Sequence, residues 1–600
     1  MRRADPRHPW ALTALAAITA LSLVGAGSSK KRRETPPKVE ETIGNLAYIQ
    51  SKGELRLEGV GLVVGLDNTG SNPGPSWYRD QLVDEMRKAG VENPNKLLNS
   101  SNLSIVIVRL RVPHGTDTSD RLDAEVELPP GSGTKSLTGG YLLSTRLREI
   151  LIAGGLPKQG SDLATAQGPV MIGTESMPDN PRVGRILGGG RVKKEMPFQI
   201  IIHENRRSFR TASLLQAAVN QRFHMRDGVN ENGMAVAKTD QYLVLKVPRV
   251  YHHNQDRYFR IVKLLPIVDT PGLRSRRIAE WGKDLLDPGK AGIAALRLEG
   301  LGVTTIEALK AGLASPNAQV RFFAAEALAY LNDASGADVL AEAAVKQPEF
   351  RAYALAALAA TDQSAAHTKL VKLMDVPEIE VRYGAFNALR TLDPHDPFLG
   401  QVRVLDEPAE PEEEGESLSL AIAGTARKRR STREDPFALY VVDCDGPPLV
   451  HVARTRRREV VVFGRNQKLL PPIVLGTGDI LLNAADGDEA IQLSKIVPSP
   501  YGDADQKVLA SLELGDVLRQ AANLGAKYPD VVTILQAASI QKNLCGPLVV
   551  DAVPGASPTY IDAAILGKDT TKKDSDVIRT KMEVTKKKNF FGRLFRWGSG

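Results

Sequence analysis

The sequence predicts an α+β fold, in which a body of mixed strands and helices occupies two segments of the chain and is interrupted by an all-α solenoid. Two glycine-punctuated blocks, Leu57–Gly70 and Leu514–Leu548, lie near opposite ends of the chain. Alanine- and leucine-rich sequence with a fixed repeat separates them. Such a period marks stacked helix pairs, whereas the β-branched runs on either side mark strands. We therefore expect both ends of the chain to complete one body.

The bulk composition indicates several folded units. The chain has 600 residues, of which 42% are hydrophobic and 5% aromatic. Since a single core stops growing at roughly 250 to 300 residues, we expect at least three units. The formal net charge of +8 belongs to the ends, because residues 1–33 and 571–600 each carry +6 and leave −4 for the chain between them. The basic pI therefore predicts no nucleic-acid partner.

The first 42 residues are expected to be a targeting segment and a leader. Arg2 and Arg3 precede an uncharged run, Trp10–Val24, and a small-residue exit at Ala26. This order is typical of a signal peptide, residues 1–26, with cleavage near Ala26. The alternative is a retained membrane anchor, although the run is shorter than the roughly 20 residues that span a bilayer. Residues 27–42 are expected to be a flexible leader.

Residues 43–272 are expected to form a mixed α+β region. Gly59, Gly61 and Gly65 interrupt a β-branched run, and a turn signal follows it. From Arg185 to Pro197, a glycine-rich turn is expected to lead into a charged strand. The other expected strands are Ile43–Gln50, Gly59–Leu66, Leu103–Val112, Arg121–Leu128, Phe198–His203 and Tyr242–Val250, and the expected helices are about Trp77–Ala89 and about Thr211–Arg222.

Residues 273–402 carry the helical repeat. Each unit has a proline that starts a helix, then an arginine, and then an alanine-rich stretch. The arginines can reach across to adjoining turns, and the alanines allow helices to approach closely. The repeat positions are Arg321, Arg351 and Arg382, spaced 30 and 31 residues apart. Three registered copies resemble the HEAT-like repeat family, whose surfaces usually bind proteins.

Charged or strand-like segments follow the repeat. Residues 403–436 are expected to be a charged linker, acidic from Asp406 to Glu416 and then basic. Residues 437–556 are expected to return to strands, namely Ala438–Val442, Glu459–Phe463, Ile473–Leu482 and Leu548–Val550, with a helical block at Leu514 to about Gln541. Residues 557–600 form a basic aromatic tail, which is either a solvated tail or a segment that docks on an anionic membrane or a partner.

Two cysteines, Cys444 and Cys545, are the only ones in the chain. An exported protein meets oxidising conditions, so they are a possible disulfide. Closing a loop of this length would stabilise the fold by roughly 4 to 5 kcal/mol in the chain-entropy treatment. The alternative is two separate buried thiols.

No motif in the sequence predicts catalysis, a cofactor or a metal site. The segment Gly131–Ser136 looks like a phosphate loop, but Thr134 stands where that motif needs a glycine before the lysine. The spacing of Gly59, Gly61 and Gly65 also misses the dinucleotide motif by one residue. The pair His252 and His253 has no further ligand at zinc-like spacing. We therefore expect no enzyme and no cofactor.

Several blocks resemble the flagellar basal-body P-ring protein family. Similar motifs occur at Leu57–Gly70, at Thr134–Leu147 and in the late helical block, over roughly residues 40–270 and 440–555. The family assembly motifs, carried over position by position, are Gly59, Gly61, Gly65, Thr69, Gly70, Lys135, Ser136, Gly139, Gly140, Asn523, Gly525 and Gln536. The helical repeat, the acidic linker and the basic tail depart from the family pattern.

The resemblance implies a structural subunit of a periplasmic ring around the flagellar rod, in the bacterial flagellum basal body. Its implied partners are itself in a ring homo-oligomer, flagellar rod and outer-ring proteins, and peptidoglycan, with an unknown protein on the helical repeat. Glycines fit this role because they permit close backbone approach. The competing hypothesis is a periplasmic scaffold or adaptor that uses the repeat to bind a protein, without a flagellar role.

Overall fold

The computed structural model describes residues 41–566, apart from 52, 72–73, 89–92, 154–155, 174–176, 178–179, 228–229, 407–434, 497–504 and 557. The expected signal peptide, most of the leader, the centre of the charged linker and most of the tail lie outside these residues. No helix in the described ranges combines the length and the apolar character needed to cross a bilayer.

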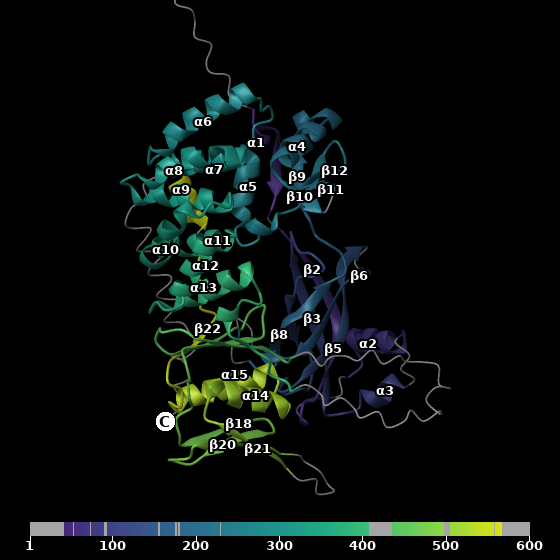
Figure 1. Cartoon of the computed structure of the whole chain (residues 1–600). Coiled ribbons are helices and arrows are strands. Elements are labelled where there is room, and N and C mark those ends of the chain that lie inside the picture. The colour runs from purple at the N-terminus through teal and green to yellow at the C-terminus, as the bar shows by residue number, and fades with distance from the viewer. Residues whose placement is uncertain are drawn as a thin grey trace, which may run out of the picture. The chain divides into compact units, whose positions relative to one another are not determined.

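A small α/β unit opens the described chain. A 4-stranded sheet in the order β1-β9-β13-β12 carries helices α4 and α5, and a short hairpin, β10-β11, follows α4 (Figure 1). Ser208 accepts a hydrogen bond from the backbone N–H of Thr211 and so begins α4. The elements are α1 Ile43–Leu46, β1 Ala47–Gln50, β9 Phe198–Ile202, α4 Phe209–Arg222, β10 His224–Asp227, β11 Asn230–Gly233, β12 Ala235–Ala237, β13 Tyr242–Leu245, η2 Arg249–Tyr251 and α5 Gln255–Leu264.

A larger antiparallel sheet is inserted between β1 and β9. Its strand order is β4-β3-β2-β5-β6-β8-β7, and β8 also pairs with β4, so six of its strands close on themselves around an apolar core. The strands are β2 Glu54–Val64, β3 Leu103–Pro113, β4 Leu122–Glu127, β5 Tyr141–Ala153, β6 Leu156–Pro169, β7 Met171–Ile172 and β8 Val183–Val192. We call these strands the closed sheet.

Two helices cover the outer face of the closed sheet at β2 and β3. Helix α2, Trp77–Lys88, and helix α3, Pro94–Leu97, lie beside this sheet in Figure 1. Leu82 and Val83 of α2 pack with Val60 and Leu62 of β2 and with Ile105 of β3 in a separate small core. The parts of β2 and β3 beside these helices, Gly59–Val63 and Leu103–Val108, are therefore buried on both faces.

The helices of the repeat stack in chain order from α6 to α13 (Figure 1). Asn317 starts α9 by accepting hydrogen bonds from the backbone N–H groups of Gln319 and Val320. The helices are α6 Pro271–Leu285, α7 Ala291–Leu301, α8 Ile306–Leu313, α9 Ala318–Tyr330, α10 Ala337–Lys346, α11 Arg351–Ala359, α12 Ser364–Leu373 and α13 Ile379–Leu392.

The late part of the chain builds two sheets around a shared core. One 5-stranded sheet has the order β14-β15-β17-β16-β22, and a 4-stranded sheet has the order β18-β19-β20-β21. Helices α14 and α15 pack against the second sheet (Figure 1). The elements are β14 Gln401–Val402, β15 Ala438–Val442, β16 Leu449–Val452, β17 Glu459–Phe463, β18 Ile473–Thr477, β19 Ile480–Ala484, β20 Ala490–Lys495, β21 Gln506–Ser511, α14 Leu514–Asn523, α15 Tyr528–Ile540, β22 Leu548–Val550 and α16 Pro558–Ile565.

The α+β class is confirmed, but several local expectations need correction. The expected strand Tyr242–Val250 ends at Leu245, and its last residues begin the 3₁₀ helix η2. The expected strand Ile43–Gln50 begins as helix α1, and the expected strand Ile473–Leu482 is the hairpin β18-β19. The glycine-rich turn expected after Arg185 is the interior of β8. Gly189 and Gly190 lie against Ile186 and Leu110, where a Cβ atom would come within 2.3 and 2.5 Å of those side chains. These glycines therefore serve close packing and not a turn.

The helical repeat does not have a core of its own. One continuous cluster of buried side chains runs from Ile43 and Phe198 in the small α/β unit through Leu296 and Phe323 in the repeat to Phe463 in β17. A second cluster joins Met171 and Leu187 of the closed sheet to the late sheets. Distant segments of the chain therefore complete one another's cores.

Candidate assembly site

The two early family motifs come together along the pairing of β2 with β5. Val63 and Val64 lie opposite Leu142 and Tyr141 in an antiparallel register. The loop after β2 and the loop before β5 consequently lie side by side. We call this contact the glycine seam, and it contains Gly59, Gly61, Gly65, Thr69, Gly70, Lys135, Ser136, Gly139 and Gly140.

Glycines in the seam stand where another backbone or side chain leaves no room for a Cβ atom. A Cβ on Gly59 would lie 2.3 Å from the carbonyl oxygen of Arg146, and one on Gly61 would lie 2.5 Å from Thr145 Oγ1. A Cβ on Gly140 would lie 2.5 Å from Val63 Cγ1. Gly65 differs, since its surroundings are open and its φ is +77°. Close approach explains the first three glycines, and backbone conformation explains Gly65.

Hydrogen bonds fasten the two loops of the seam to each other. The hydroxyl of Thr69 lies within hydrogen-bond distance of two carbonyl oxygens and can donate to either one. Its Oγ1 is 2.8 Å from the oxygen of Ser136 and 2.7 Å from that of Leu66. The backbone N–H of Lys135 donates to the carbonyl oxygen of Thr69 at 2.8 Å, while the Lys135 side chain points to solvent. Gly70 donates its N–H to Ser101 at 2.8 Å. The motif residues of both blocks therefore act within the chain.

The late motif residues lie outside the seam. Asn523 and Asp406 exchange two hydrogen bonds, of 3.0 and 2.9 Å. Gly525 has a φ of +102° and lies beside Lys495 Nζ. Gln536 is half-buried on α15. One residue of this late block does reach the seam, namely Lys527, whose Nζ donates to the carbonyl oxygen of Gly139 at 3.0 Å. The sequence motifs did not single it out.

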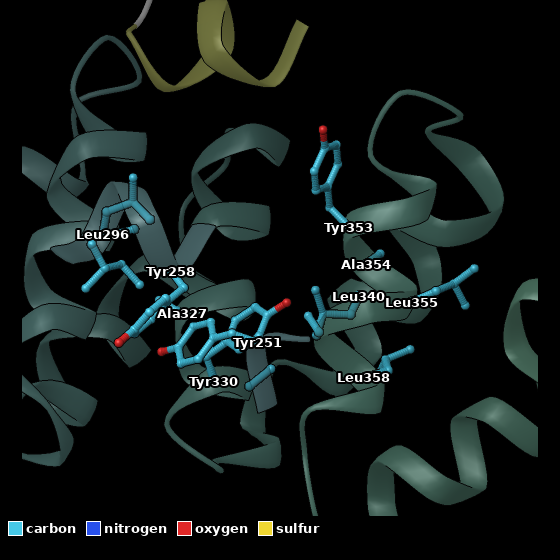
Figure 2. Close-up of a cluster of buried hydrophobic side chains, with 14 of the residues drawn as sticks. Tyr251, Tyr258, Leu296, Ala327, Tyr330, Leu340, Tyr353, Ala354, Leu355 and Leu358 are labelled. Atoms are coloured by element: carbon cyan, nitrogen blue, oxygen red, sulfur yellow. The ribbon is translucent and has the colours of Figure 1, made fainter. Parts of the chain in front are cut away.

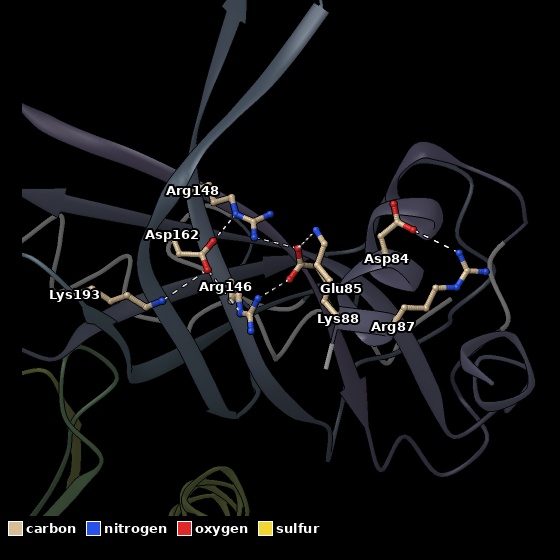
Figure 3. A network of polar contacts seen from close by, with 8 residues as sticks. All are labelled: Asp84, Glu85, Arg87, Lys88, Arg146, Arg148, Asp162 and Lys193. Atoms are coloured by element: carbon tan, nitrogen blue, oxygen red, sulfur yellow. Dashed lines mark hydrogen bonds and ion pairs between the residues drawn. The ribbon is translucent and has the colours of Figure 1, made fainter. Parts of the chain in front are cut away.

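Charged side chains hold α2 against the closed sheet. Arg148 of β5 lies between Glu85 of α2, at 3.0 Å, and Asp162 of β6, at 2.5 Å (Figure 3). Arg146 also contacts both carboxylates, at 3.3 and 3.7 Å. Burial works against ionisation of Asp162, but the hydrogen bond and charge of Arg148 outweigh it and lower the pKa of that carboxyl. The charges fix α2 in one orientation over the sheet.

The three repeat arginines share one structural role. Each donates to backbone carbonyls at the end of the preceding helix. Arg321 reaches Ser315 at 2.9 Å, Arg351 reaches Ala344 at 2.9 Å, and Arg382 reaches Met374 at 2.8 Å. The last carbonyls of a helix have no partner within that helix, and a cation is favourable there. The repeated arginine is therefore a helix cap built into each unit.

Buried charges join the small α/β unit to the repeat. Arg257 of α5 pairs with Glu299 of α7 and Glu326 of α9, each at 2.5 Å, and its side chain is 4% exposed. Tyr251 donates to Glu299 at 2.7 Å and stacks on Tyr330 (Figure 2). We call this group the arginine junction. Burial raises the pKa of Glu326, although the charge of Arg257 opposes the shift.

A second set of contacts joins the repeat to the late sheets, and Cys444 takes part in it. Arg382 donates to the carbonyl oxygen of Pro447 at 2.5 Å and to Cys444 Sγ at 3.2 Å. Cys545 is exposed and donates to the carbonyl oxygen of Lys468 at 3.1 Å. Both cysteines are free thiols, so the disulfide considered from the sequence is not formed in this structure.

The described residues include no group of three or more His, Cys, Asp or Glu side chains suited to a metal ion. Around His252, the ring nitrogen Nε2 lies 3.3 Å from the carbonyl oxygen of Val247. His253 Nε2 lies 3.0 Å from Thr391 Oγ1. Gly131, at the start of the phosphate-loop-like segment, has a φ of +79°, and the backbone N–H of Ser132 bonds to Pro129 in a turn.

Comparison with known proteins gives two family matches. Residues 42–272 match the model of the flagellar P-ring protein family, and residues 306–391 match that of HEAT repeats. The second match confirms the repeat predicted from the arginine spacing. The first covers the small α/β unit, the closed sheet and the glycine seam, whereas residues 437–556 lie beyond it, and their likeness to the family stays a prediction.

Individual relatives are named flagellar P-ring protein. That of Fervidobacterium nodosum is 31% identical over 248 residues, which are 39% of this chain and 67% of the relative. That of Aquifex aeolicus is 29% identical over 222 residues, or 35% and 57% of the two chains. That of Thermotoga maritima is 26% identical over 242 residues, or 38% and 67%. The chain thus spans between about half and two thirds of the length of these relatives.

Proposed function

The chain belongs to the flagellar P-ring protein family, and from this premise we propose that it is a structural subunit of a periplasmic ring around the flagellar rod. The match of residues 42–272 to the family carries this proposal. In this role the subunit associates with its own copies and with rod and outer-ring proteins, and it performs no catalysis. Peptidoglycan next to the ring is a further proposed contact.

The construction of the matched region supports a passive, rigid collar. A rod that turns inside a ring needs a wall that keeps its shape under load. The closed sheet leaves few free strand edges, because β8 pairs with both β6 and β4. Arg148, Glu85 and Asp162 lock α2 onto this sheet, and tight glycine contacts join β2 to β5. These features limit internal motion in the region that carries the family match.

A second candidate function is a periplasmic scaffold that binds a protein through the repeat, without a flagellar role. The specific observation in its favour is the HEAT match at residues 306–391, since stacked helix pairs form extended protein-binding surfaces. In the first proposal the same repeat is an added docking arm on each ring subunit.

The decisive experiment removes the gene and examines motility and isolated basal bodies together. We expect loss of swimming in soft agar, basal bodies that lack an annulus in negatively stained images, and recovery of both on expression of the full chain. An epitope at the C-terminus would allow antibody labelling of the recovered annulus. Normal swimming and an intact annulus in the deletion strain would contradict the ring proposal and favour the scaffold.

A further inference from the structure

A cleft of about 1240 Å³ opens where several segments of the chain converge, away from the glycine seam. Its walls include the turn between β3 and β4, the residues after η2, the end of α13 and the turn between β16 and β17. The sequence patterns predicted no binding site in these segments. Only His252 and His253 were considered, as metal ligands, and they were rejected.

Three arginines in this cleft form no ion pair with the residues that the structure describes. They are Arg121, Arg456 and Arg457, and all three are exposed to solvent. Arg121 and Arg456 meet across Gly188, where an added Cβ would lie 2.8 Å from the Arg456 carbonyl oxygen and 3.5 Å from Arg121 Cβ. Positive charge is thus concentrated in one place.

The turn that presents Arg456 is fixed by a carboxylate from a distant part of the chain. Arg456 has a φ of +60°, and its backbone N–H donates to both oxygens of Asp123, at 3.0 and 2.8 Å. The same carboxylate accepts from the N–H of Gly188 at 2.8 Å. The arginine side chains are therefore presented by a fixed backbone, so a ligand would not have to order it.

The carboxylates of the cleft have partners of their own. Glu459 accepts from Arg390 and from Tyr383, each at 2.5 Å. Asp435 accepts from the N–H of Leu405 at 3.2 Å. Asp117 accepts from the N–H of Ser119 at 2.6 Å. These acids are engaged in holding the walls, which leaves the three guanidinium groups available to an anion.

We propose that this cleft binds a carboxylate-rich polypeptide segment of another molecule. Guanidinium groups match carboxylates in paired hydrogen bonds, and the cleft exceeds the roughly 300 to 1,000 Å³ of sites for small ligands. Apolar walls at Leu122, Phe198 and Phe437 suit the carbon atoms of peptide side chains. This site goes beyond the proposed ring function and does not depend on it.

The chain contains an acidic stretch of its own, Asp406–Glu416, next to the cleft in sequence. Its first residue, Asp406, is bound to Asn523 at the end of α14 and lies 3.7 Å from Arg519 Nη1. Neither of these two residues lines the cleft. The contacts of Asp406 thus hold this residue at α14, and although Leu405 before it bonds to Asp435 of the cleft wall, we assign the site to a segment supplied in trans.

The test is fluorescence anisotropy of a labelled oligoglutamate peptide with the full chain at low salt. The variant Arg456→Gln/Arg457→Gln removes two cleft charges, and Arg206→Gln/Arg207→Gln removes an adjacent, exposed pair elsewhere. We expect the cleft variant to bind about tenfold or more weakly and the control variant less than about twofold more weakly. Equal weakening of both would overturn the proposal, because general charge attraction alone would then explain binding.

Two further measurements distinguish the occupants. A neutral oligoglutamine peptide is expected to bind at least about tenfold more weakly than oligoglutamate, and an oligothymidylate that binds as tightly as oligoglutamate would overturn the choice of a polypeptide. Replacing the glutamates between 407 and 416 by glutamine should leave the oligoglutamate affinity unchanged. A marked rise in that affinity would show that the chain's own stretch occupies the cleft, and it would overturn the assignment to a segment supplied in trans. Thermal melting of each variant checks that folding is preserved, and none of these results depends on ring formation.

Discussion

The glycine seam and the arginine junction bring distant segments together in opposite ways. In the seam, side chains are absent, so that a Cβ on Gly59 would lie only 2.3 Å from a facing carbonyl oxygen. In the junction, large charged side chains are buried, with Arg257 4% exposed between two carboxylates. The seam depends on shape and the junction depends on charge balance. Each is therefore sensitive to a different class of substitution.

The comparison also separates what belongs to the family region from what has been added. The seam lies wholly inside residues 42–272, which match the flagellar P-ring family. The junction links that region to helices of the repeat. Because Arg257 takes its partners from α7 and α9, removal of the repeat would take away both carboxylates and the apolar side chains that complete the core around α5. The repeat is thus built into the fold and is not a detachable arm.

The largest effect is expected at the junction. Arg257→Met leaves Glu299 and Glu326 buried without their cation, which should reduce the free energy of unfolding by about 3 to 5 kcal/mol. Urea denaturation followed by circular dichroism would measure it. Adding Glu299→Gln and Glu326→Gln should recover most of the loss. The control is Arg260→Met, which lies on α5 like Arg257 but pairs with the exposed Asp562 of α16. This substitution should cost less than about 1 kcal/mol. A similar loss in both single variants would contradict the role of charge.

The next effect is expected in the seam. Gly140→Val places two methyl groups where Val63 Cγ1 and Leu66 Cδ2 already lie within 2.5 and 2.9 Å of a Cβ position. Overpacking of this kind costs about 1 to 3 kcal/mol or more. The same denaturation measurement applies, with Gly74→Val as the control, because nothing lies within 4 Å of a Cβ there. A stable Gly140→Val protein would show that the seam is looser than its contacts indicate.

A pH series extends the comparison to a third contact, in which Arg390 of α13 and Glu459 of β17 join the repeat to the late sheets. Burial would raise the pKa of Glu459, but the charge of Arg390 and the hydrogen bond from Tyr383 lower it below the ordinary value of 4.5. This carboxylate therefore stabilises the fold above pH 4.5, and the contribution is lost as pH falls through the lowered pKa. Thermal melting below pH 4.5 should show a shallower decline in Glu459→Gln than in the unaltered chain, and parallel declines would contradict this assignment.

The smallest effect is expected at Gly65. Its φ of +77° strains any other residue, but the nearest atom to a Cβ is 3.9 Å away. Gly65→Ala should therefore cost only about 1 kcal/mol through backbone conformation. A loss as large as that of Gly140→Val would show that space and not φ governs this position. The two glycines of one motif thus give a direct test of the two causes.

Local sequence signals predicted many elements and missed what depends on distant partners. The runs Leu103–Val112 and Ala438–Val442 became strands close to their expected bounds, since β-branched runs favour strands in any context. Nothing local indicated that Gly188, Gly189 and Gly190 lie inside a strand, because the reason is the packing of Ile186 and Leu110 against them. The β5-β6 hairpin, Tyr141–Pro169, also went unpredicted.

The motif residues were named from the sequence as assembly residues, and the structure shows that the early ones contact one another within the chain. The early motif residues do come together, as their shared presence in one family pattern suggests. Lys527 could not be found in this way, since the contact of its side chain with Gly139 joins residues that lie far apart in the sequence. The repeat arginines were predicted by their period, and the expectation that they reach adjoining turns agrees with their carbonyl contacts.

The core shared by Met171, Leu187 and the late strands has a consequence for synthesis. A polypeptide leaves the ribosome or an export channel from its amino end, so these two side chains emerge long before the late strands and helices that share their core. During that interval the early region presents an unfinished apolar surface, which closes only after those late elements have emerged. A chain truncated ahead of residue 437 is therefore left permanently incomplete, and quality-control proteases would recognise it.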